Sequence, residues 1–277
     1  MNIDRFSRIV IDPQFWLCVG GAGLAAIHLT QVFRTGQDEL FSSSLLYWVA
    51  VGSLVWKKRD QLRLGSSVLS ISCGILLMAI VLLRSQSIAG FDAFLRVAPL
   101  LSAIALALLA SGISGLKQYW QEFVVLSFLI PHSALLSQVF DASPLTAEFA
   151  TVLLWILGFD VSRQGVYVSL LTGSVEVNPG CSGYGNMVQL LSIAVIYLFM
   201  FPTKRWQQLG LPIAAILLGF TVNGIRVALM VVLASSNSTA FQYWHEGEGS
   251  LIFSLLSVLI LGCWIWSQSR ITEGEER

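Results

Sequence analysis

One cysteine of this chain lies in a setting that favours nucleophilic chemistry. Cys181 stands in the stretch 176–187, directly after the helix-breaking pair Pro179 and Gly180 and just before an apolar run. A helix is therefore expected to begin at or just after Cys181. The positive end of a helix lowers the pKa of a thiol from its ordinary value of about 8.5, which favours the reactive thiolate. Cysteine is also a small apolar residue, and packing alone explains this position equally well.

An arginine inside an apolar run is the second unusual residue. Arg226 lies within the apolar run 211–235, and an arginine at the centre of a membrane helix costs about 2.5–3.5 kcal/mol. Such residues nearly always face a polar cavity or a functional partner, although a long side chain can also extend toward the membrane surface. Asn223 lies three residues earlier on the same helix face. We expect Asn223 to orient the guanidinium.

A histidine supplies the third chemical group. His245 lies in the segment 241–249, immediately before the last apolar run, and the ordinary histidine pKa of about 6.5 suits proton transfer at neutral pH. A cysteine activated by a histidine is the expected pairing for acyl transfer, and a nearby cation can stabilise the oxyanion. His28 and His132 lie in apolar runs, where we expect hydrogen-bonded packing residues without a chemical role.

The composition is that of a protein that crosses a membrane several times. Of 277 residues, 55% are hydrophobic and 12% are charged, and the mean hydropathy is +0.74. The expected fold is therefore an all-α polytopic membrane protein, one domain over residues 1–277. Runs of spanning length predict about eight transmembrane helices, near 14–33, 40–56, 68–83, 96–114, 123–140, 182–201, 211–235 and 250–267.

Charge gives the expected orientation of these helices. The net charge is zero, and lysines and arginines fall mostly in short loops, so nucleic-acid binding is not indicated. A further apolar stretch, 145–159, is short, and its full crossing would place the basic loops at Lys57 and Lys204 on opposite sides of the bilayer. We therefore predict an interfacial or re-entrant helix at 145–159, cytoplasmic termini and a site on the extracytoplasmic side. The first apolar run lacks a clear cleavage site and is expected to be a membrane helix.

The segment 165–178 leads into the cysteine and shows β-branched alternation around Thr172-Gly173-Ser174. This pattern predicts a small β-hairpin on the outer face. An exposed strand edge beside a nucleophile is able to hold an extended peptide by main-chain hydrogen bonds. A simple plug over the outer face explains the same pattern.

Three other functions are compatible with these residues. A transporter is one, since an intramembrane arginine also marks transport paths, although no repeated broken helices are found. A metal site of His245, Glu246 and Glu248 is another, although so short a loop motif is common and no second ligand cluster lies in another outer loop. A non-catalytic scaffold would leave the three residues unexplained. No cofactor is expected, and a disulfide framework is disfavoured because the other cysteines lie in apolar runs, namely Cys18, Cys73 and Cys263.

Taken together, these motifs resemble the exosortase/archaeosortase family. They are Cys-Ser-Gly at 181–183 before one span, Asn-Gly-Ile-Arg at 223–226 within the next, and His245 before the last. The resemblance covers residues 161–266. The residues that flank the cysteine look most like the cyanobacterial branch, the cyanoexosortases.

The resemblance implies an integral-membrane cysteine protease or transpeptidase of the cell inner or plasma membrane. Its substrates would be exported proteins with a PEP-CTERM-like sorting signal, which is a short motif, a membrane helix and a basic tail. Cys181 matches the nucleophile, Arg226 the arginine and His245 the histidine of the family triad, with Asn223 and Ser182 as supporting candidates. The acyl acceptor would be water, a lipid head group or a surface polymer.

Overall fold

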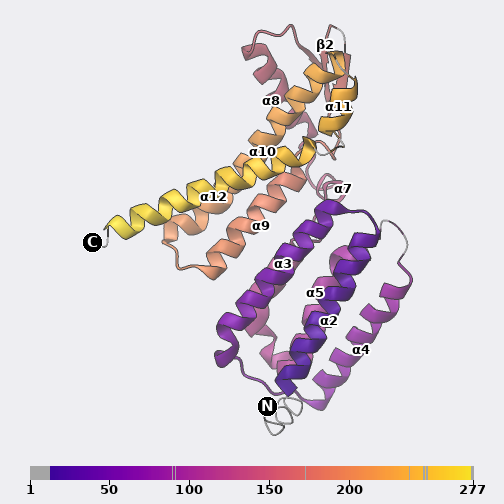
Figure 1. Ribbon diagram of the computed structural model, residues 1–277, viewed down its shortest axis with the longest axis vertical. Helices are drawn as coiled ribbons and strands as arrows, with labels where there is room; N and C mark the ends of the chain where they lie inside the picture. The colour runs from indigo at the N-terminus through magenta and orange to yellow at the C-terminus, as the bar shows by residue number, and fades with distance from the viewer. Residues whose placement is uncertain are drawn as a thin grey trace, which may run out of the picture. The chain divides into compact units, whose positions relative to one another are not determined.

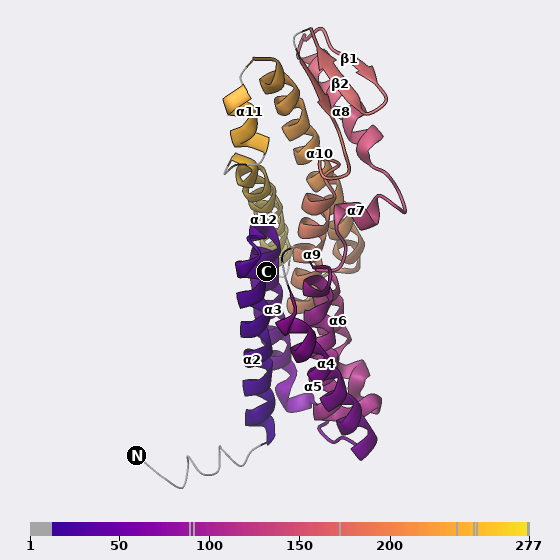
Figure 2. The ribbon, with the colours of Figure 1, turned by 90° about the vertical axis from the view of Figure 1, so that its right-hand side faces the viewer.

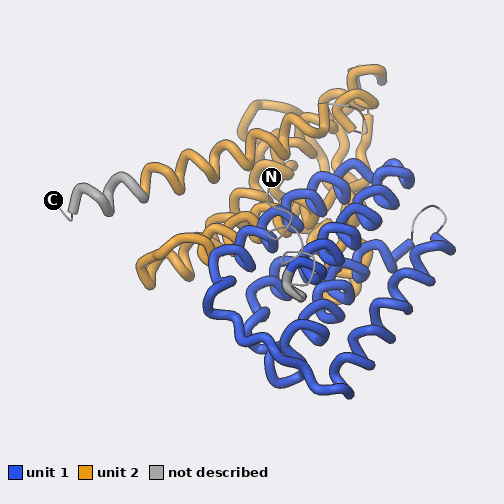
Figure 3. The backbone as a smooth tube through the Cα atoms, turned by 60° about the horizontal axis from the view of Figure 1, so that its bottom comes forward, with its two compact units in different colours: residues 1–130 blue, residues 131–277 orange. Residues whose placement is uncertain are grey.

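The structure is a computed structural model that describes residues 13–275 except residues 89, 91, 172, 237, 246 and 248. It is mostly helical. The chain divides into two compact units, residues 1–130 and residues 131–277 (Figure 3).

Unit 1 is a helical bundle. Within it α2 and α4 pack against α5, and α3 packs against α2 and α6. Acidic residues in the first turn of α3 and lysines in its last turn complement the helix dipole. The elements of this unit are α2 (Pro13–Arg34), α3 (Asp38–Lys58), η1 (Arg59–Gln61), α4 (Val68–Gln86), α5 (Phe94–Gly115), η2 (Leu116–Tyr119) and α6 (Trp120–Ser127).

The predicted membrane span 123–140 is wrong. Its first residues belong to α6, which has only eight residues and covers about 12 Å. The chain then turns, and the next helix is the single turn α7 (Ser133–Leu136). Pro131 has no N–H to donate to a helix and disfavours helical backbone in the residue before it. The boundary between the two units falls within this same stretch.

Among the described residues, six stretches are long and apolar enough to cross a membrane. They are α2, α3, α4, the stretch from α5 through α6, α10 (Arg205–Ser236) and α12 (Gly249–Glu275). The predicted span 182–201 corresponds to α9 (Tyr184–Met200), which has seventeen residues, or about 26 Å. The stretch 145–159 corresponds to α8 (Ser143–Ile156), with fourteen. The chain is therefore a multi-pass membrane protein.

Three helices of unit 2 run side by side, namely α9, α10 and α12 (Figure 1). α9 and α10 approach closely at Gly219, where an added Cβ would lie 2.8 Å from the Cα of Met187. Asn186 joins all three helices, because its Nδ2 donates to the Gly219 carbonyl at 3.2 Å and its Oδ1 accepts from Ser257 Oγ at 2.9 Å. These contacts fix the helix that follows Cys181.

A small antiparallel sheet packs against the C-terminal half of α10 (Figure 2). It has the strand order β1-β2-β3, with β1 (Ser162–Gln164), β2 (Tyr167–Leu170) and β3 (Gly173–Glu176), one strand more than a hairpin. Val168 pairs with Val175 in the register of β2 and β3. An apolar core joins the sheet to α8 and α10, and its fully buried residues include Ala147, Val168, Val177 and Val231. The sheet therefore anchors the segment that leads to Cys181. Thr172, at the predicted turn, lies outside the described residues.

Candidate active site

Cys181 lies in a tight turn between β3 and α9. The turn begins at Asn178, whose backbone oxygen accepts from the Cys181 N–H at 2.9 Å and whose Oδ1 lies 3.2 Å from the same nitrogen. Ser182 Oγ donates to the Pro179 carbonyl at 2.7 Å. Proline presets the backbone for such a turn, and asparagine readily bonds its own backbone a few residues on. The turn therefore holds the cysteine backbone in place.

The helix after Cys181 begins later than the sequence pattern indicates. α9 starts at Tyr184, and its N-cap residue Gly183 has a φ of +90°, a conformation that side-chain-bearing residues rarely adopt. A Cβ on Gly183 would also lie 2.9 Å from Nδ2 of Asn223. Because the helix-end effect decays within the first turn, Cys181 gains less from the helix end than expected.

Burial raises the pKa of the Cys181 thiol above its ordinary value, and this effect exceeds the lowering by the Arg226 charge and by the Asn178 hydrogen bond. The expected lowering of this pKa is therefore wrong. Desolvation disfavours the thiolate, since the side chain is half-buried against the core of unit 2. At neutral pH the cysteine rests as a thiol, which needs a base to become a nucleophile.

His245 provides a base within reach. It is the last residue of α11 (Ser238–His245), and its Nε2 lies 3.8 Å from Cys181 Sγ, a distance at which a thiol is able to hydrogen-bond. The imidazole stacks on Phe241, one turn earlier, with ring centroids 5.2 Å apart and planes inclined by 16°. The stack limits rotation of the ring while Nε2 faces the sulfur.

Arg226 holds the end of α11. Its Nη2 donates to the backbone carbonyl of His245 at 2.7 Å, so a cation caps the negative end of that short helix. Its Nε is buried and has no hydrogen-bond partner among the described residues. A buried donor left unpaired costs about 1–3 kcal/mol. The guanidinium therefore positions the histidine and retains a donor that the described part of the chain does not satisfy.

Asn223 and Thr146 fix two successive carbonyls of the cysteine turn. Asn223 Nδ2 donates to the carbonyl of Cys181 at 2.7 Å. The sequence predicts that Asn223 orients the guanidinium of Arg226, whereas this hydrogen bond holds the cysteine backbone. Thr146 Oγ1, from α8, donates to the carbonyl of Ser182 at 3.0 Å. The fully buried Ser182 side chain serves the turn itself. Elements distant in sequence thus converge on one loop.

The structure adds three residues to those that the sequence singled out: Asn178, Thr146 and Phe241. The Asn178-Pro179-Gly180 run is a turn signature that marks Asn178 as a backbone-bonding residue. Phe241 precedes His245 by one helical turn, so helical spacing predicts that stack once α11 is known. No sequence signal points to Thr146.

The remaining histidines lie elsewhere. His28 Nε2 lies 2.8 Å from the Leu95 carbonyl, and Trp48 Nε1 donates to His28 Nδ1 at 3.2 Å, so His28 is confirmed as a hydrogen-bonded packing residue. His132 lies in the loop before α7 rather than within a span. Two of the residues of the alternative metal site, Glu246 and Glu248, lie outside the described residues. In the described part of the chain, no three His, Cys, Asp or Glu side chains are grouped to hold a metal ion.

Comparison with known proteins gives one match. Residues 35–262 match the family model described as transmembrane exosortase. No curated protein and no solved structure matches the chain. The matched stretch covers most of the sequence and includes Cys181, Arg226 and His245. The chain therefore belongs to the transmembrane exosortase family.

Proposed function

We propose that this protein is a cysteine protease or transpeptidase that cleaves the C-terminal sorting signal of exported proteins through a thioester on Cys181. The observation that carries the proposal is the 3.8 Å approach of Cys181 Sγ and His245 Nε2. Two segments 64 residues apart meet there, and each is held by separate hydrogen bonds. Membership of the exosortase family supports the substrate class, because the family acts on exported proteins with C-terminal signals.

The first step forms the tetrahedral intermediate. Because burial raises the pKa of the Cys181 thiol, the S–H proton passes to His245 Nε2 as the sulfur attacks the scissile carbonyl carbon. The carbonyl π electrons move to the oxygen, which becomes an oxyanion. His245 acts as general base in this step and becomes an imidazolium.

Arg226 is the candidate for the oxyanion partner. Its Nη2 is occupied by the His245 carbonyl, whereas its Nε is unpaired among the described residues. A fixed cation that carries an unused donor stabilises charge that develops only in the transition state. Asn223 and Thr146 act through the loop, since each holds one backbone carbonyl of the cysteine turn.

The second step breaks the C–N bond. The oxyanion returns its electrons to re-form the carbonyl, the imidazolium of His245 gives its proton to the departing amine, and the acyl group remains on sulfur as a thioester. An acceptor then attacks the thioester carbonyl while His245 takes its proton. The second tetrahedral intermediate collapses with cleavage of the C–S bond, and the proton on His245 returns to sulfur to restore the thiol. Water gives hydrolysis, whereas an amine or hydroxyl of a lipid head group or surface polymer gives transfer.

We place this site on the extracytoplasmic side of the membrane, where exported substrates are found, with both termini in the cytoplasm. The support is the charge pattern, because the basic residues of 57–63 and 204–205 then face the cytoplasm. A membrane-impermeant maleimide applied to intact cells should label Cys181 in a variant that lacks the other cysteines. Labelling of Cys181 only after cell lysis would indicate the opposite orientation.

The direct test is processing of a co-expressed exported reporter that carries a C-terminal sorting helix. Cys181→Ala should lower the processing rate on the order of 10⁴-fold or more, at a matched amount of protein in the membrane. Cys73→Ala and Cys263→Ala are matched controls, because both cysteines are exposed and neither belongs to the cysteine turn or to α11. Hydroxylamine should release the acyl group from the wild type as a hydroxamate. Processing by Cys181→Ala at the wild-type rate would remove the nucleophile from this proposal.

A further inference from the structure

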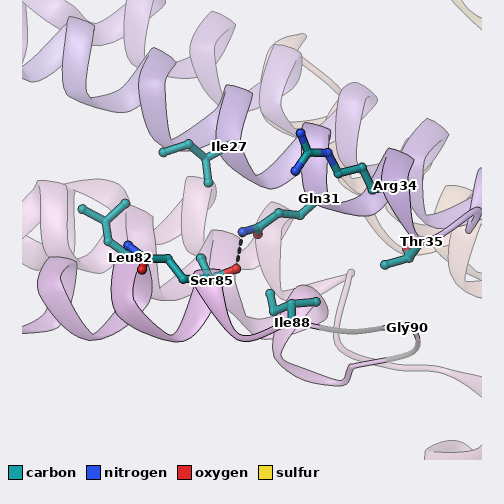
Figure 4. A pocket seen from close by; sticks show the side chains of 9 residues that line it. Ile27, Gln31, Arg34, Thr35, Leu82, Ser85, Ile88 and Gly90 are labelled. Atoms are coloured by element: carbon teal, nitrogen blue, oxygen red, sulfur yellow. Dashed lines mark hydrogen bonds between the residues drawn. The ribbon is translucent and has the colours of Figure 1, made fainter.

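A cavity of about 510 Å³ lies in unit 1 between the C-terminal ends of α2 and α4 (Figure 4). Its volume is within the range of small-ligand sites. The two helices each pack along α5, and the cavity separates their ends. Ile27, Gln31 and Arg34 line it from successive turns of α2, and Leu82 and Ser85 line it from α4.

Gln31 carries an unsatisfied acceptor in this lining. Its Nε2 donates to the Ser85 carbonyl at 2.7 Å, which ties α2 to α4. Its Oε1 is buried and has no hydrogen-bond partner among the described residues. Burial of an acceptor without a donor is unfavourable. Because this oxygen is covered, a small rotation of the amide toward the cavity would let a ligand N–H or O–H group satisfy it.

Arg34 adds a positive charge at the same end. It is the last residue of α2 and is exposed. The described ion pairs are Lys58–Glu122, Arg59–Asp60 and Arg84–Asp92, none of which involves Arg34. By contrast, Arg84 in the last turn of α4 pairs with Asp92 at 2.7 Å. Of these two arginines, Arg34 is the one that can receive an anion.

The opposite end of the cavity is apolar. Ile27 precedes Gln31 by one helical turn, about 6 Å, and Leu82 precedes Ser85 by about 4.5 Å. Both helices are candidate membrane spans that end near this cavity, at Arg34 and Gln86. The apolar side chains that the two helices contribute therefore lie deeper in the bilayer than their polar ones, which lie at the level of the head groups. Ile88, beyond the end of α4, adds one apolar side chain at the head-group end. The gradient along the two helices is that of a phospholipid.

We propose that the cavity binds one glycerophospholipid whose head group carries a hydrogen-bond donor, such as glycerol or ethanolamine. The phosphate lies at Arg34, the head-group donor bonds to Gln31 Oε1, and the acyl chains lie beside Ile27 and Leu82. A choline head group supplies the phosphate but has no N–H or O–H. The site therefore discriminates by head-group hydrogen bonding as well as by charge.

Native mass spectrometry of the full chain tests this binding independently of any peptide processing. The detergent-solubilised protein is titrated with phosphatidylglycerol, phosphatidylethanolamine and phosphatidylcholine of identical acyl chains. We expect one lipid per chain and an affinity about fivefold higher for the first two lipids, which is the net effect of one hydrogen bond. Equal affinity for phosphatidylcholine would overturn the assignment of Gln31.

Two variants and one control sharpen the result. Arg34→Gln should lower the affinity for all three lipids about tenfold, as expected for loss of a charged contact to phosphate. Arg63→Gln removes the same charge from the exposed loop before α4, outside the cavity, and should leave binding unchanged. Gln31→Met should abolish the preference for donor-bearing head groups, and a thermal melt checks that the loss of its bond to Ser85 leaves the chain folded.

A further arm separates a lipid from a free phosphate. Glycerol 3-phosphate offers the phosphate and hydroxyl groups without acyl chains, and we expect it to displace bound phosphatidylglycerol only at far higher concentration. Displacement at equal concentration would replace the lipid with a soluble phosphate ligand. If Arg34→Gln binds lipid with the same affinity as the wild type, the proposed binding site is wrong.

Discussion

Each unit holds a basic side chain at least partly buried among apolar helices, but the two units compensate it differently. In unit 1, Lys58 Nζ lies 2.7 Å from Oε2 of Glu122, which is only 2% exposed, and Lys58 also donates to the Gln118 carbonyl. In unit 2, Arg226 donates to the neutral carbonyl of His245 and keeps one buried N–H without a partner among the described residues. Lys58 is neutralised by a carboxylate, whereas none of the described ion pairs includes Arg226.

The difference separates a structural ion pair from a reactive site. A buried charge that is already paired has little to offer to a ligand, and its main effect is on stability. An uncompensated cation is costly in the resting protein but stabilises negative charge that appears during a reaction. By this criterion the proposed chemistry belongs to unit 2, and the Lys58–Glu122 pair belongs to the framework.

Among the tests of this comparison, the largest expected effect is that of removing the guanidinium of Arg226, which has no carboxylate partner among the described residues. Arg226→Gln should lower the rate of reporter processing about 10²–10³-fold, as does loss of an oxyanion donor, whereas Arg226→Lys should retain part of the activity. The matched variant Lys58→Gln should leave the rate per folded molecule unchanged. If both variants slow processing equally, the distinction between the units fails.

The next effect concerns the paired cation. Glu122→Met leaves the ammonium of Lys58 without its partner and should destabilise the protein by about 2 kcal/mol or more, because one charge of a mostly buried pair remains. The double variant Lys58→Met with Glu122→Met should recover most of this loss. Thermal unfolding in detergent measures both. A double variant no more stable than Glu122→Met alone would contradict a simple ion-pair role.

A smaller effect is expected on the cysteine itself. Since burial raises the pKa of Cys181 and the Arg226 charge lowers it, Arg226→Gln should raise this pKa further and reduce the thiolate fraction at any given pH. The rate of iodoacetamide alkylation should therefore rise at higher pH in Arg226→Gln than in the wild type. The measurement uses a background in which Cys18, Cys73 and Cys263 are serine. A profile shifted to lower pH would exclude the electrostatic contact.

The smallest effect should come from the loop support. Thr146→Val removes the hydrogen bond to the Ser182 carbonyl, worth about 1 kcal/mol, and should slow processing a few-fold. Thr151→Val, on the same helix, removes only a bond to the Ala147 carbonyl within α8 and serves as the control. Equal rates in the two variants would show that the loop does not depend on Thr146.

The sequence predicts much of the fold because membrane helices are defined by composition and length. The predicted runs 40–56, 68–83 and 96–114 match α3, α4 and α5 within a few residues. The failure at 123–140 has a local cause, since average hydropathy does not register the chain turn before Pro131. The number of crossings depends on such short segments.

The residue types of the candidate site are predictable from the sequence, but their environment is not. The sequence identified Cys181, Arg226 and His245 from their unusual settings, and the structure brings their atoms or backbones into contact. The direction predicted from the sequence for the pKa of Cys181 is wrong, because burial depends on packing from distant segments. Thr146 was missed for the same reason, since it reaches the loop across 36 residues of sequence.

The length of α10 has a consequence for the depth at which chemistry takes place. The helix has 32 residues, or about 48 Å, well beyond the roughly 30 Å of a hydrocarbon core. Arg226 lies about 32 Å from the Arg205 end, so a helix that enters the bilayer at Arg205 brings Arg226 to the opposite boundary. Under the proposed function, the length of α10 sets the depth of Arg226 relative to the bilayer. A substrate anchored by about 20 apolar residues would present to Arg226 the peptide bonds just outside its own membrane segment.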